Sequence, residues 1–422
     1  MSKTYPLPYG KKTQEFILPD SMAVDWIAPA PVPGEDQPLA AVEQALIHPV
    51  DGSGLQGFRG AKSASIAVND KTRPVPLHLL LPPLVQQLED VGVPRDRITL
   101  FFATGTHTPL TPAEMNALLP PALAGRFSIV SHDCDNQAEL VSLGTTERGT
   151  PVLCSGSFLR AEVKIVTGNI EPHHFAGFSG GVKTFSIGLA SRQTINRNHS
   201  LLLDPHARTG EFEQNPLRQD IEEIGRMGQI DFALNAVLNE HKEIVKAYSG
   251  SPQGVMQAGV PLARQICQTQ AQGQYDLVIA SVGGHPKDIN LYQAQKALTH
   301  ASMLTRDGGV VILVGACPEG SGSKGFESLM GGSSSPADVL QKFDRVNFQV
   351  GPHKAFQFAR ELVRIHVILL SKMPADIVRK LLLIPARSPA DAIQLSMDIL
   401  SNIARTAILP RAINTIPLIT NK

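Results

Sequence analysis

The chain has few cysteines, no excess of charge of either sign and no long apolar run. Its four cysteines, Cys134, Cys154, Cys267 and Cys317, lie far apart and form no CxxC pair. We therefore expect reduced, buried thiols, and neither a disulfide framework nor a metal site built on cysteine. Lysine plus arginine and aspartate plus glutamate both number 38 among the 422 residues. This balance disfavours nucleic acid or an anionic membrane surface as the main partner, although it leaves room for a local basic pocket.

Signals for export and for membrane insertion are also missing. The opening MSKTYPLPYGKKTQEF carries charges with no apolar stretch behind them, and no uninterrupted apolar run reaches membrane-spanning length. With 42% hydrophobic residues, the chain has enough material for two domains with cores of their own. We therefore predict a cytoplasmic protein with no membrane partner.

Strand and helix patterns alternate from about residue 38 to the end of the chain. Buried strands are indicated at residues 63–70, 98–107, 126–133, 162–168 and 275–284. Such alternation is typical of α/β proteins with mostly parallel sheets. We predict an α/β fold with two domains, a cofactor-binding domain over residues 1–270 and a second domain over residues 271–422. The active site is expected in the interdomain cleft, with the last segment packing back on the first domain.

Prolines, glycines and capping residues set local expectations. Residues 1–35 are rich in proline and glycine and are expected to form an extended arm. LHLLLPPLVQQLEDVG predicts a helix broken at its two prolines, and GSGSKGFESLMGGSSS (320–335) predicts a mobile loop. TPAEMNALL begins a helix with a capping box completed by Glu114. Ser191 is a candidate N-cap for the helix that carries His199.

Residues 168–200 form the segment that is densest in reactive side chains. GNIEPHHFAGFSGGVKTFSIGLASRQTINRNHS holds three histidines, a lysine and five glycines. A buried strand leads into it, which places His173 at the carboxyl end of that strand. Asp70, His107 and His132 follow other predicted strands. In open α/β sheets ligands bind at this edge, so one crevice can collect these side chains.

The glycines around Lys183 indicate an anion site. Glycine lets backbone N–H groups approach a ligand, and FSGGVKTFSIG reads as the opening of a helix, whose N-terminus favours anions. A phosphate or nucleotide would contact Ser179, Gly180 and Gly181. GFSGGVKT is close to the phosphate loop GxxxxGK[ST], but Val182 replaces the second glycine and no convincing Walker-B strand follows. A generic nucleotide-hydrolysing enzyme is therefore the weaker interpretation.

Three histidines are candidates for chemistry. His107, His173 and His199 are too far apart in the sequence for a linear metal motif such as HExxH. Taken singly, each is as compatible with a structural role as with a functional one. Together, on strand ends and beside a glycine-rich anion site, they favour function. One histidine that ligates a metal and two that act as bases would account for all three.

Cationic side chains suggest where an acidic substrate would bind. Arg73, in the turn NDKTRP, is suited to clasp a phosphate or carboxylate in a forked geometry, whereas the alternative is a solvated surface turn. Tyr292, Gln293 and Lys296 share one helical face after a glycine turn. An ordinary interdomain helix face would explain their spacing equally well.

At these residues the sequence resembles the nickel-dependent lactate racemase family, whose members use a nickel-pincer nucleotide. The matching segments are NDKTRPVP, ATGTHTPLT, GNIEPHHFAGFSGGVK, NHS and GGHPKDINLYQAQKA, in the family's order. The long central motif is highly specific, whereas beyond residue 300 only GPHKAFQFAR is recognisable. The resemblance implies an isomerase, a racemase or epimerase that inverts C2 of a 2-hydroxy acid.

The resemblance also implies a role for each matching residue. Lys183 would attach the cofactor, a pyridinium-3-thioamide-5-thiocarboxylic acid mononucleotide that holds nickel, and His199 would ligate the nickel. His107 and His173 would be the acid–base pair. Contacts to the cofactor phosphate and the substrate would come from the first motif, with Asp70, Thr72 and Arg73. The substrate side of the second domain would be lined by Tyr292, Gln293 and Lys296.

The implied mechanism explains why two histidines are present. The C2 hydrogen leaves one face of the acid, is held by the cofactor as hydride and returns to the other face. A base on either side takes the hydroxyl proton as the transient 2-keto acid forms. Arg73 and Lys296 would hold the carboxylate and stabilise developing charge. Closure of the second domain over the cleft would exclude water.

The substrate is less closely specified than the reaction. Lys71, His174 and His285 add polar groups where smaller or aromatic side chains would suit a methyl group, so a sugar acid or a dicarboxylate is an alternative to lactate. The implied partners are a small 2-hydroxy acid and the enzymes that make and insert the cofactor. The competing hypotheses are a phosphoryl-transfer enzyme that uses GFSGGVKT and a non-catalytic cofactor-binding protein.

Overall fold

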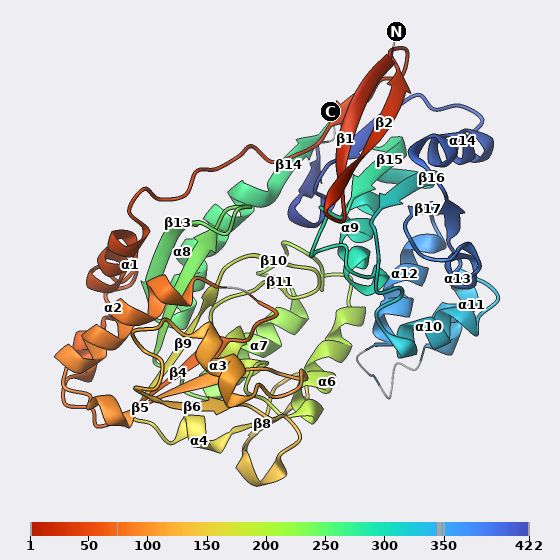
Figure 1. Cartoon of the computed structure of the whole chain (residues 1–422). Helices are drawn as coiled ribbons and strands as arrows, with labels where there is room; N and C mark the ends of the chain where they lie inside the picture. The colour runs from red at the N-terminus through yellow and green to blue at the C-terminus, as the bar shows by residue number, and fades with distance from the viewer. Residues whose placement is uncertain (1, 74, 344–347, 349–350, 421–422) are drawn as a thin grey trace. The chain divides into compact units, whose positions relative to one another are not determined.

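The computed structural model describes residues 2–73, 75–343, 348 and 351–420 and is coloured along the chain in Figure 1. The chain divides into two compact units, one of residues 31–266 and the other of residues 1–30 and 267–422. Each unit holds a six-stranded, mostly parallel sheet, which confirms the predicted α/β fold class. The expected division placed residues 1–270 in one domain, whereas here residues 1–30 belong to the same unit as residues 267–422.

The sheet of the unit formed by residues 31–266 has the strand order β13-β12-β9-β4-β5-β6. These strands are β13 (Ile244–Gly250), β12 (Phe232–Leu238), β9 (Val163–Asn169), β4 (Ala64–Asn69), β5 (Ile98–Ala103) and β6 (Ser128–Ser131). The edge strand β13 pairs antiparallel with β12, and the other neighbours are parallel. The segments DFALNAVLN and EIVKAYSG therefore form an antiparallel hairpin at the edge of the sheet.

Helices cover both faces of this sheet, which explains why its strands are almost continuously apolar. One face packs against α1 (Pro38–Ile47), α2 (Leu77–Asp90) and α3 (Pro112–Leu118). The other packs against α4 (Gly156–Leu159), α5 (Lys183–Ser186), α6 (Arg192–Ser200), α7 (Pro216–Met227) and α8 (Pro252–Cys267). Along β4 the side chains alternate, with Ile66 and Val68 in the first core and Ala67 in the second.

Two antiparallel pairs lie outside the six-stranded sheet. They are β7 (Leu140–Thr145) with β8 (Pro151–Ser155), and β10 (Pro172–His173) with β11 (Gly177–Phe178). The second pair is only two residues long, and it opposes His173 to Gly177. The glycine-rich segment therefore begins as a tight hairpin directly after β9.

Local sequence signals gave mixed results. Thr111 and Glu114 form the predicted capping box at α3, and Ser191 accepts a hydrogen bond from the Thr194 N–H at the start of α6. The predicted break in α2 is wrong, because this helix continues through Pro82 and Pro83. Its buried leucine face stabilises the helix in spite of the two missing N–H groups.

The other unit has the parallel strand order β18-β17-β16-β15-β19-β3. The strands are β18 (Ile384–Ala386), β17 (His366–Leu370), β16 (Thr305–Val314), β15 (Tyr275–Ser281), β19 (Thr406–Leu409) and β3 (Val24–Trp26). A further parallel pair joins β14 (Gln268–Ala271) to β20 (Ile416–Ile419). The N-terminal segment thus supplies the edge strand β3, as well as the hairpin of β1 (Ser2–Tyr9) and β2 (Lys12–Pro19).

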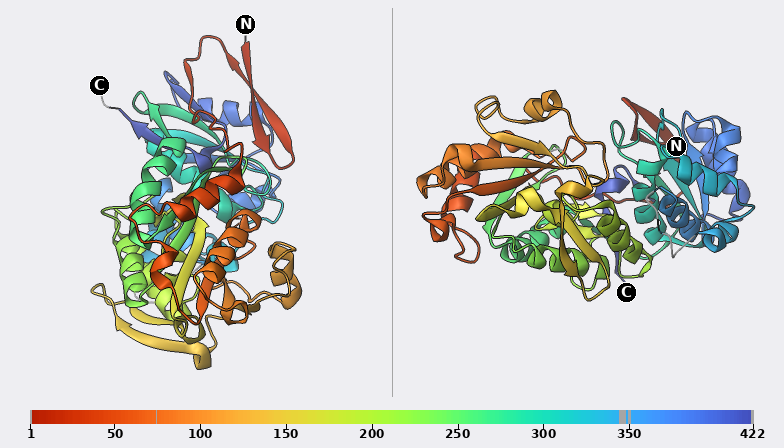
Figure 2. Two further views of the ribbon diagram at one scale, coloured as in Figure 1. Left: turned by 90° about the vertical axis from the view of Figure 1, so that its left-hand side faces the viewer. Right: turned by 90° about the horizontal axis from the view of Figure 1, so that it is seen from below.

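Both faces of this second sheet are covered as well. The β1–β2 hairpin, red in Figures 1 and 2, and α14 (Pro389–Ile399) share one core with alternate strand residues such as Leu277 and Ile279. The opposite core contains α9 (Leu291–Leu304), α10 (Lys324–Gly331), α11 (Pro336–Lys342), α12 (His353–Leu362) and α13 (Ala375–Lys380). The expected mobile loop at 320–335 is wrong, because α10 occupies its centre and buries Phe326 and Met330.

Within the described ranges, no helix is both long and apolar enough to span a membrane.

Candidate active site

Three neighbouring strands of the first unit end in the predicted functional residues. β9, β4 and β5 lie side by side and parallel (Figure 1). Asp70 follows directly after β4, His107 lies in the turn after β5, and His173 follows β9. Because the carboxyl ends of parallel strands share one edge of a sheet, the fold brings these segments to the same edge.

Asp70, Thr72 and His107 form a hydrogen-bonded cluster at this edge. The Nδ1 atom of His107 lies 2.7 Å from Asp70 Oδ2, and the Thr72 hydroxyl donates to Asp70 Oδ1 at 2.7 Å. The Asp70 side chain is 3% exposed, whereas that of His107 is 49% exposed. Burial opposes ionisation of Asp70, but hydrogen bonds from His107 and Thr72 and the charges of His107 and Arg73 leave its pKa below the usual value. The buried carboxylate therefore holds the Nδ1–H of His107 and leaves Nε2 as the proton acceptor.

The cations of the NDKTRP turn serve different purposes. Lys71 Nζ lies 2.6 Å from Glu114 Oε1, in the capping box of α3, so this lysine is held by a surface ion pair. The positive charge of Arg73 acts on both Asp70 and His199, which associates Arg73 with the predicted site. Pro74 of this motif lies outside the described residues.

The hydrogen bonding of the His173 ring is the reverse of that of His107, because Nδ1 of His173 accepts a hydrogen bond and Nδ1 of His107 donates one. His173 is buried, and its Nδ1 accepts a hydrogen bond from the Ala176 backbone N–H at 3.2 Å. Because an N–H can only donate, the neutral ring carries its proton on Nε2. The ring stacks on His174, with centroids 4.6 Å apart, and meets the edge of Phe175, which also contacts His199. Phe175 thus lies between a predicted acid–base residue and the predicted metal ligand.

The backbone of the glycine-rich loop is largely engaged by the protein itself. The Ser179 N–H donates to the Glu171 carbonyl, the Gly181 N–H to Asn235 Oδ1 and the Lys183 N–H to the Gly180 carbonyl. α5 is only four residues long. The loop is therefore not built as a phosphate cradle of the P-loop type, which supports the weaker rank given to that interpretation.

Buried Arg218 of α7 holds this loop through hydrogen bonds to its carbonyl groups. Its guanidinium donates to the carbonyl oxygens of Phe178 and Gly180 at 3.0 and 3.1 Å and pairs with Glu222. Gly180 and Gly181 have φ values of +94° and +58°, which favour glycine. A Cβ at Gly181 would also lie 2.6 Å from Met256 Cγ. The glycines thus serve conformation and close packing.

Lys183 and His199 are close enough to influence each other. Lys183 opens α5 and is 8% exposed, and His199 lies near the end of α6. Burial and the positive charges of Lys183 and Arg73 lower the pKa of His199 to about 3, against a smaller opposing effect of the Ile195 carbonyl. His199 is therefore a neutral imidazole at physiological pH, which is the form that ligates metals.

The three residues predicted from the second unit lie on α9. Lys296 Nζ lies 3.1 Å from Gln293 Oε1, and the Tyr292 ring meets that of His353 edge-on at 5.9 Å. Burial raises the pKa of Tyr292 to about 12. Lys354 of α12 is fully buried 5.2 Å from the centre of the Tyr292 ring, and burial and the charge of Lys296 lower its pKa well below the usual value.

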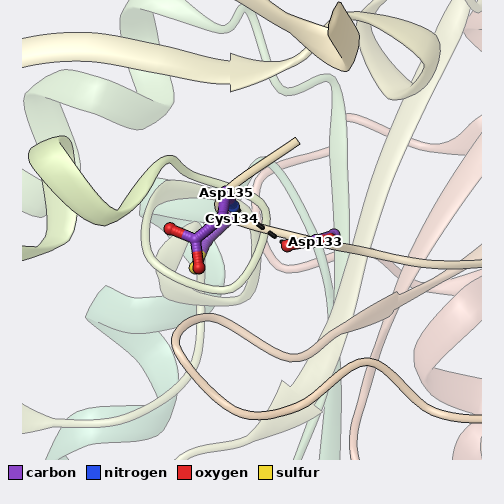
Figure 3. Close-up of side chains that lie close together, drawn as sticks. All are labelled: Asp133, Cys134 and Asp135. Carbon is purple, nitrogen blue, oxygen red and sulfur yellow. Dashed lines mark hydrogen bonds between the residues drawn. The ribbon is translucent and has the colours of Figure 1, made fainter. Parts of the chain in front are cut away.

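A different group has the composition of a metal site but not its chemistry. Asp133, Cys134 and Asp135 place ligand atoms within 4.8 Å of one another (Figure 3). Burial raises the pKa of the Cys134 thiol, and Asp135 is engaged by Arg192 through two hydrogen bonds. His132, expected in the same crevice, uses Nε2 to bond the Ala190 carbonyl at 2.9 Å. These strand-end residues therefore have structural partners.

Sequence reasoning missed the residues that support the site from other elements. These are Asn198, Arg218, Asp220 and Asn235, all 0% exposed. Asn235 had a usable signal, because it is the only polar residue in the buried strand FALNAVL. Arg218 and Asp220 lie in an ordinary amphipathic helix, so no pattern distinguished them.

The fold and these residues define an α/β protein with a histidine- and lysine-containing site at the carboxyl edge of a parallel sheet. Two family models match this chain. They are the lactate racemase N-terminal domain, over residues 9–210, and the lactate racemase C-terminal domain, over residues 270–416. The chain belongs to the lactate racemase family. The predicted family and its enzyme class, isomerase, are thereby confirmed.

Two curated relatives and two solved structures extend this finding. The chain is 30% identical to lactate racemase of Thermoanaerobacterium thermosaccharolyticum over 97% of this chain and 98% of the relative. It is also 30% identical to lactate racemase of Lactiplantibacillus plantarum, over 89% and 90%. The T. thermosaccharolyticum lactate racemase apoprotein structure is similar, with a TM-score of 0.91, 30% identity and coverage of 99% and 100%. A Thermotoga maritima protein shares the fold, with a TM-score of 0.65, 17% identity and coverage of 93% and 100%.

Proposed function

We propose that this protein is a racemase or C2 epimerase of 2-hydroxy acids that works with a lysine-tethered nickel-pincer nucleotide. Lactate is the first candidate substrate, because both curated relatives are named lactate racemase. The observation that carries the proposal is that the Phe175 ring contacts both His173 and His199, at the sheet edge that also receives His107. Burial and the positive charges of Lys183 and Arg73 lower the pKa of His199, which favours its neutral imidazole form. This residue set supplies a tether, a metal ligand and two proton-transfer groups.

The described residues fit such a cofactor. The Ser179 hydroxyl and Asn69 Oδ1 are buried atoms that have no hydrogen-bond partner among the described residues. A bound nucleotide would offer partners of both kinds, and buried polar atoms are usually paired. Lys183 would hold the group, His199 would ligate its nickel, and the NDKTRP turn would contact its phosphate. The chemistry that this cofactor supplies when bound is reversible acceptance of the C2 hydrogen.

The side chains would divide the remaining work. His107, oriented by Asp70, accepts the hydroxyl proton at Nε2 as the 2-keto acid forms. His173 offers Nε2–H to the substrate oxygen on the other side, and this proton restores the hydroxyl of the inverted product once the ring has taken up a second proton from water at Nδ1, so that a neutral imidazole is left. His107 releases to water the proton that it accepted, so no proton is gained or lost overall. Arg73 and Lys296 neutralise the carboxylate, while Tyr292 and Gln293 contact the rest of the acid. Lys71 is not counted among the groups that set substrate polarity, because it pairs with Glu114.

Intact-protein mass spectrometry with nickel analysis tests this proposal, on protein co-expressed with the enzymes that make and insert the pincer cofactor. We expect a nucleotide-sized adduct that maps to Lys183 and stoichiometric nickel. The adduct should be lost in Lys183→Ala and retained in Lys246→Ala, a matched change at an exposed lysine of the same unit. Unmodified, nickel-free wild-type protein under these conditions would overturn the proposal.

A stereochemical assay of lactate, sugar acids and hydroxy dicarboxylates identifies the substrate. His107→Ala and His173→Ala should each abolish inversion while nickel stays bound, and loss of nickel from them would mean that bases and ligands have been confused. Retained cofactor with no turnover of any acid would favour a non-catalytic binding protein. Tight, magnesium-dependent ATP binding would instead favour the phosphoryl-transfer alternative.

A further inference from the structure

The predicted metal ligand His199 is the partly buried end of a chain of hydrogen bonds that is otherwise buried. Its Nδ1 atom lies 3.2 Å from the side-chain oxygen of its neighbour Asn198. The amide nitrogen of Asn198 donates to two acceptors, the Leu217 carbonyl at 3.1 Å and Asp220 Oδ2 at 2.8 Å. Because both of these partners can only accept, they require the NH₂ end of the amide, and the oxygen must be turned toward His199.

Asp220 in turn is held by donors from another part of the unit. It is 0% exposed, and the hydroxyl groups of Thr146 and Thr150 donate to its two oxygens at 2.6 and 2.9 Å. Together with the Asn198 amide, three donors surround a carboxylate that burial would otherwise penalise. The network joins α6, α7 and the turn after β7. The orientation of Asn198 is therefore set by tertiary structure.

The direction of these bonds has one consequence for the imidazole. The Asn198 oxygen can only accept, so the His199 Nδ1 must carry the proton, and the lone pair lies on Nε2. Histidines that ligate metals commonly donate the other ring N–H to a fixed acceptor, which selects the tautomer and aims the ring. We infer that Asn198 and Asp220 are positioning residues that hold His199 in the Nδ1–H form with Nε2 as its ligating atom. This inference rests on the proposed function for its metal, but the tautomer itself does not.

A purely structural role would leave the network harder to explain. Replacing buried charges with apolar side chains of similar volume is often neutral or stabilising. Here the carboxylate is connected through a single amide to the ring of His199. The arrangement is suited to fixing an imidazole orientation.

Nitrogen-15 NMR of the cofactor-free full chain, labelled at histidine, tests the inference near neutral pH. His199 is assigned by its loss in His199→Gln. We expect long-range proton–nitrogen correlations of wild-type His199 to show the proton on Nδ1, and Asp220→Asn and Asn198→Leu to shift it toward the Nε2–H form. Asp231→Asn, a matched change at the partner of Lys164, should change nothing. His132, whose Nε2 meets a carbonyl, is an internal reference for the opposite tautomer.

A milder variant and a measurement of nickel retention test the same inference in two further ways. Thr150→Val removes a single donor from Asp220, so it tests the network if the larger changes do not fold, and it should produce a smaller shift in the same direction. In cofactor-loaded protein, nickel retention should fall about 10- to 100-fold in Asn198→Leu relative to Asp231→Asn. A wild-type Nε2–H tautomer, or variants identical to wild type, would overturn the inference. Wild-type protein with the expected tautomer but no adduct and no nickel would instead count against the proposed function alone.

Discussion

The Nδ1 atom of His107 lies 2.7 Å from Asp70 Oδ2, whereas the Nδ1 atom of His173 accepts a backbone N–H. The two histidines proposed to act on one substrate therefore enter the reaction in different ring forms. Asp70 selects the form in which Nε2 of His107 accepts a proton. An amide at position 70 could donate as well as accept and would no longer enforce this form.

Asp70→Asn should therefore lower kcat/KM for inversion by about 100-fold or more, the usual contribution of a positioned acid–base group. Initial rates in both directions measure this by chiral separation of product, with nickel content determined on the same samples. Asp135→Asn, at an exposed ion pair with Arg192, provides the control and should retain wild-type rates. Unchanged kcat/KM in Asp70→Asn would show that this carboxylate does not act through His107.

Gly177→Ala should destabilise the unit of residues 31–266 strongly. The φ of Gly177 is +70°, and a Cβ there would lie 1.8 Å from the Glu211 carbonyl oxygen. Gly60 has a similar φ of +88° with nothing within 4 Å of such an atom, so Gly60→Ala isolates the cost of the backbone conformation, about 1 kcal/mol. Urea unfolding should show an additional loss of about 2 kcal/mol or more for Gly177→Ala. Equal losses in the two variants would mean that β11 shifts without cost.

Arg218→Met should also destabilise this unit, because it removes the donor of two loop carbonyl groups and leaves Glu222 unpaired. Loss of one partner from a buried ion pair costs about 3–5 kcal/mol. Arg192→Met removes an exposed partner of Asp135 and should cost about 1 kcal/mol or less. Hydrogen exchange of peptides covering residues 168–200 reports the effect locally. If these peptides are protected equally in Arg218→Met and in Arg192→Met, the loop does not depend on Arg218.

The second unit should lose stability in acid because of His300. Its burial, opposed by the Ala412 carbonyl and reinforced by the charge of Lys296, lowers its pKa from 6.5 to about 4. Below pH 6.5 the unfolded chain therefore binds more protons at this residue than the folded chain. As the pH is lowered from 6.5 to about 4, the free energy of unfolding decreases. The loss at about pH 4.5 is on the order of 2 kcal/mol relative to pH 7.5.

His300→Gln should remove this part of the acid sensitivity, whereas His366→Gln, at an exposed histidine of the same unit, should not. The single tryptophan, Trp26, belongs to β3 of this unit, so its fluorescence can follow urea unfolding there. The difference in unfolding free energy between pH 7.5 and 4.5 should shrink by about 2 kcal/mol in His300→Gln alone. Identical pH dependence in all three proteins would contradict a buried neutral His300.

The strand ends and helix caps were predictable because their signals are local. Apolar runs that end in Asp70, His107 or His173 indicate strands of a parallel sheet, and the capping residues of α3 and α6 bond to N–H groups three positions away. The break in α2 and the loop at 320–335 were mispredicted because local propensity was outweighed by burial of leucine and phenylalanine side chains in the cores. Lys71 was misjudged because its partner Glu114 lies 43 residues away.

The sequence by itself determined the fold class, the edge of the sheet at which the proposed site lies and the family motifs that carry the candidate reactive residues. Only the tertiary structure decided the states of those residues. The ring forms of His107 and His173, the neutrality of His199 and the support of the glycine loop by Arg218 all depend on partners from separate elements. Hydrogen-bond direction and burial are properties of the assembled fold, so residue spacing along the chain does not encode them in a form that sequence reading can recover.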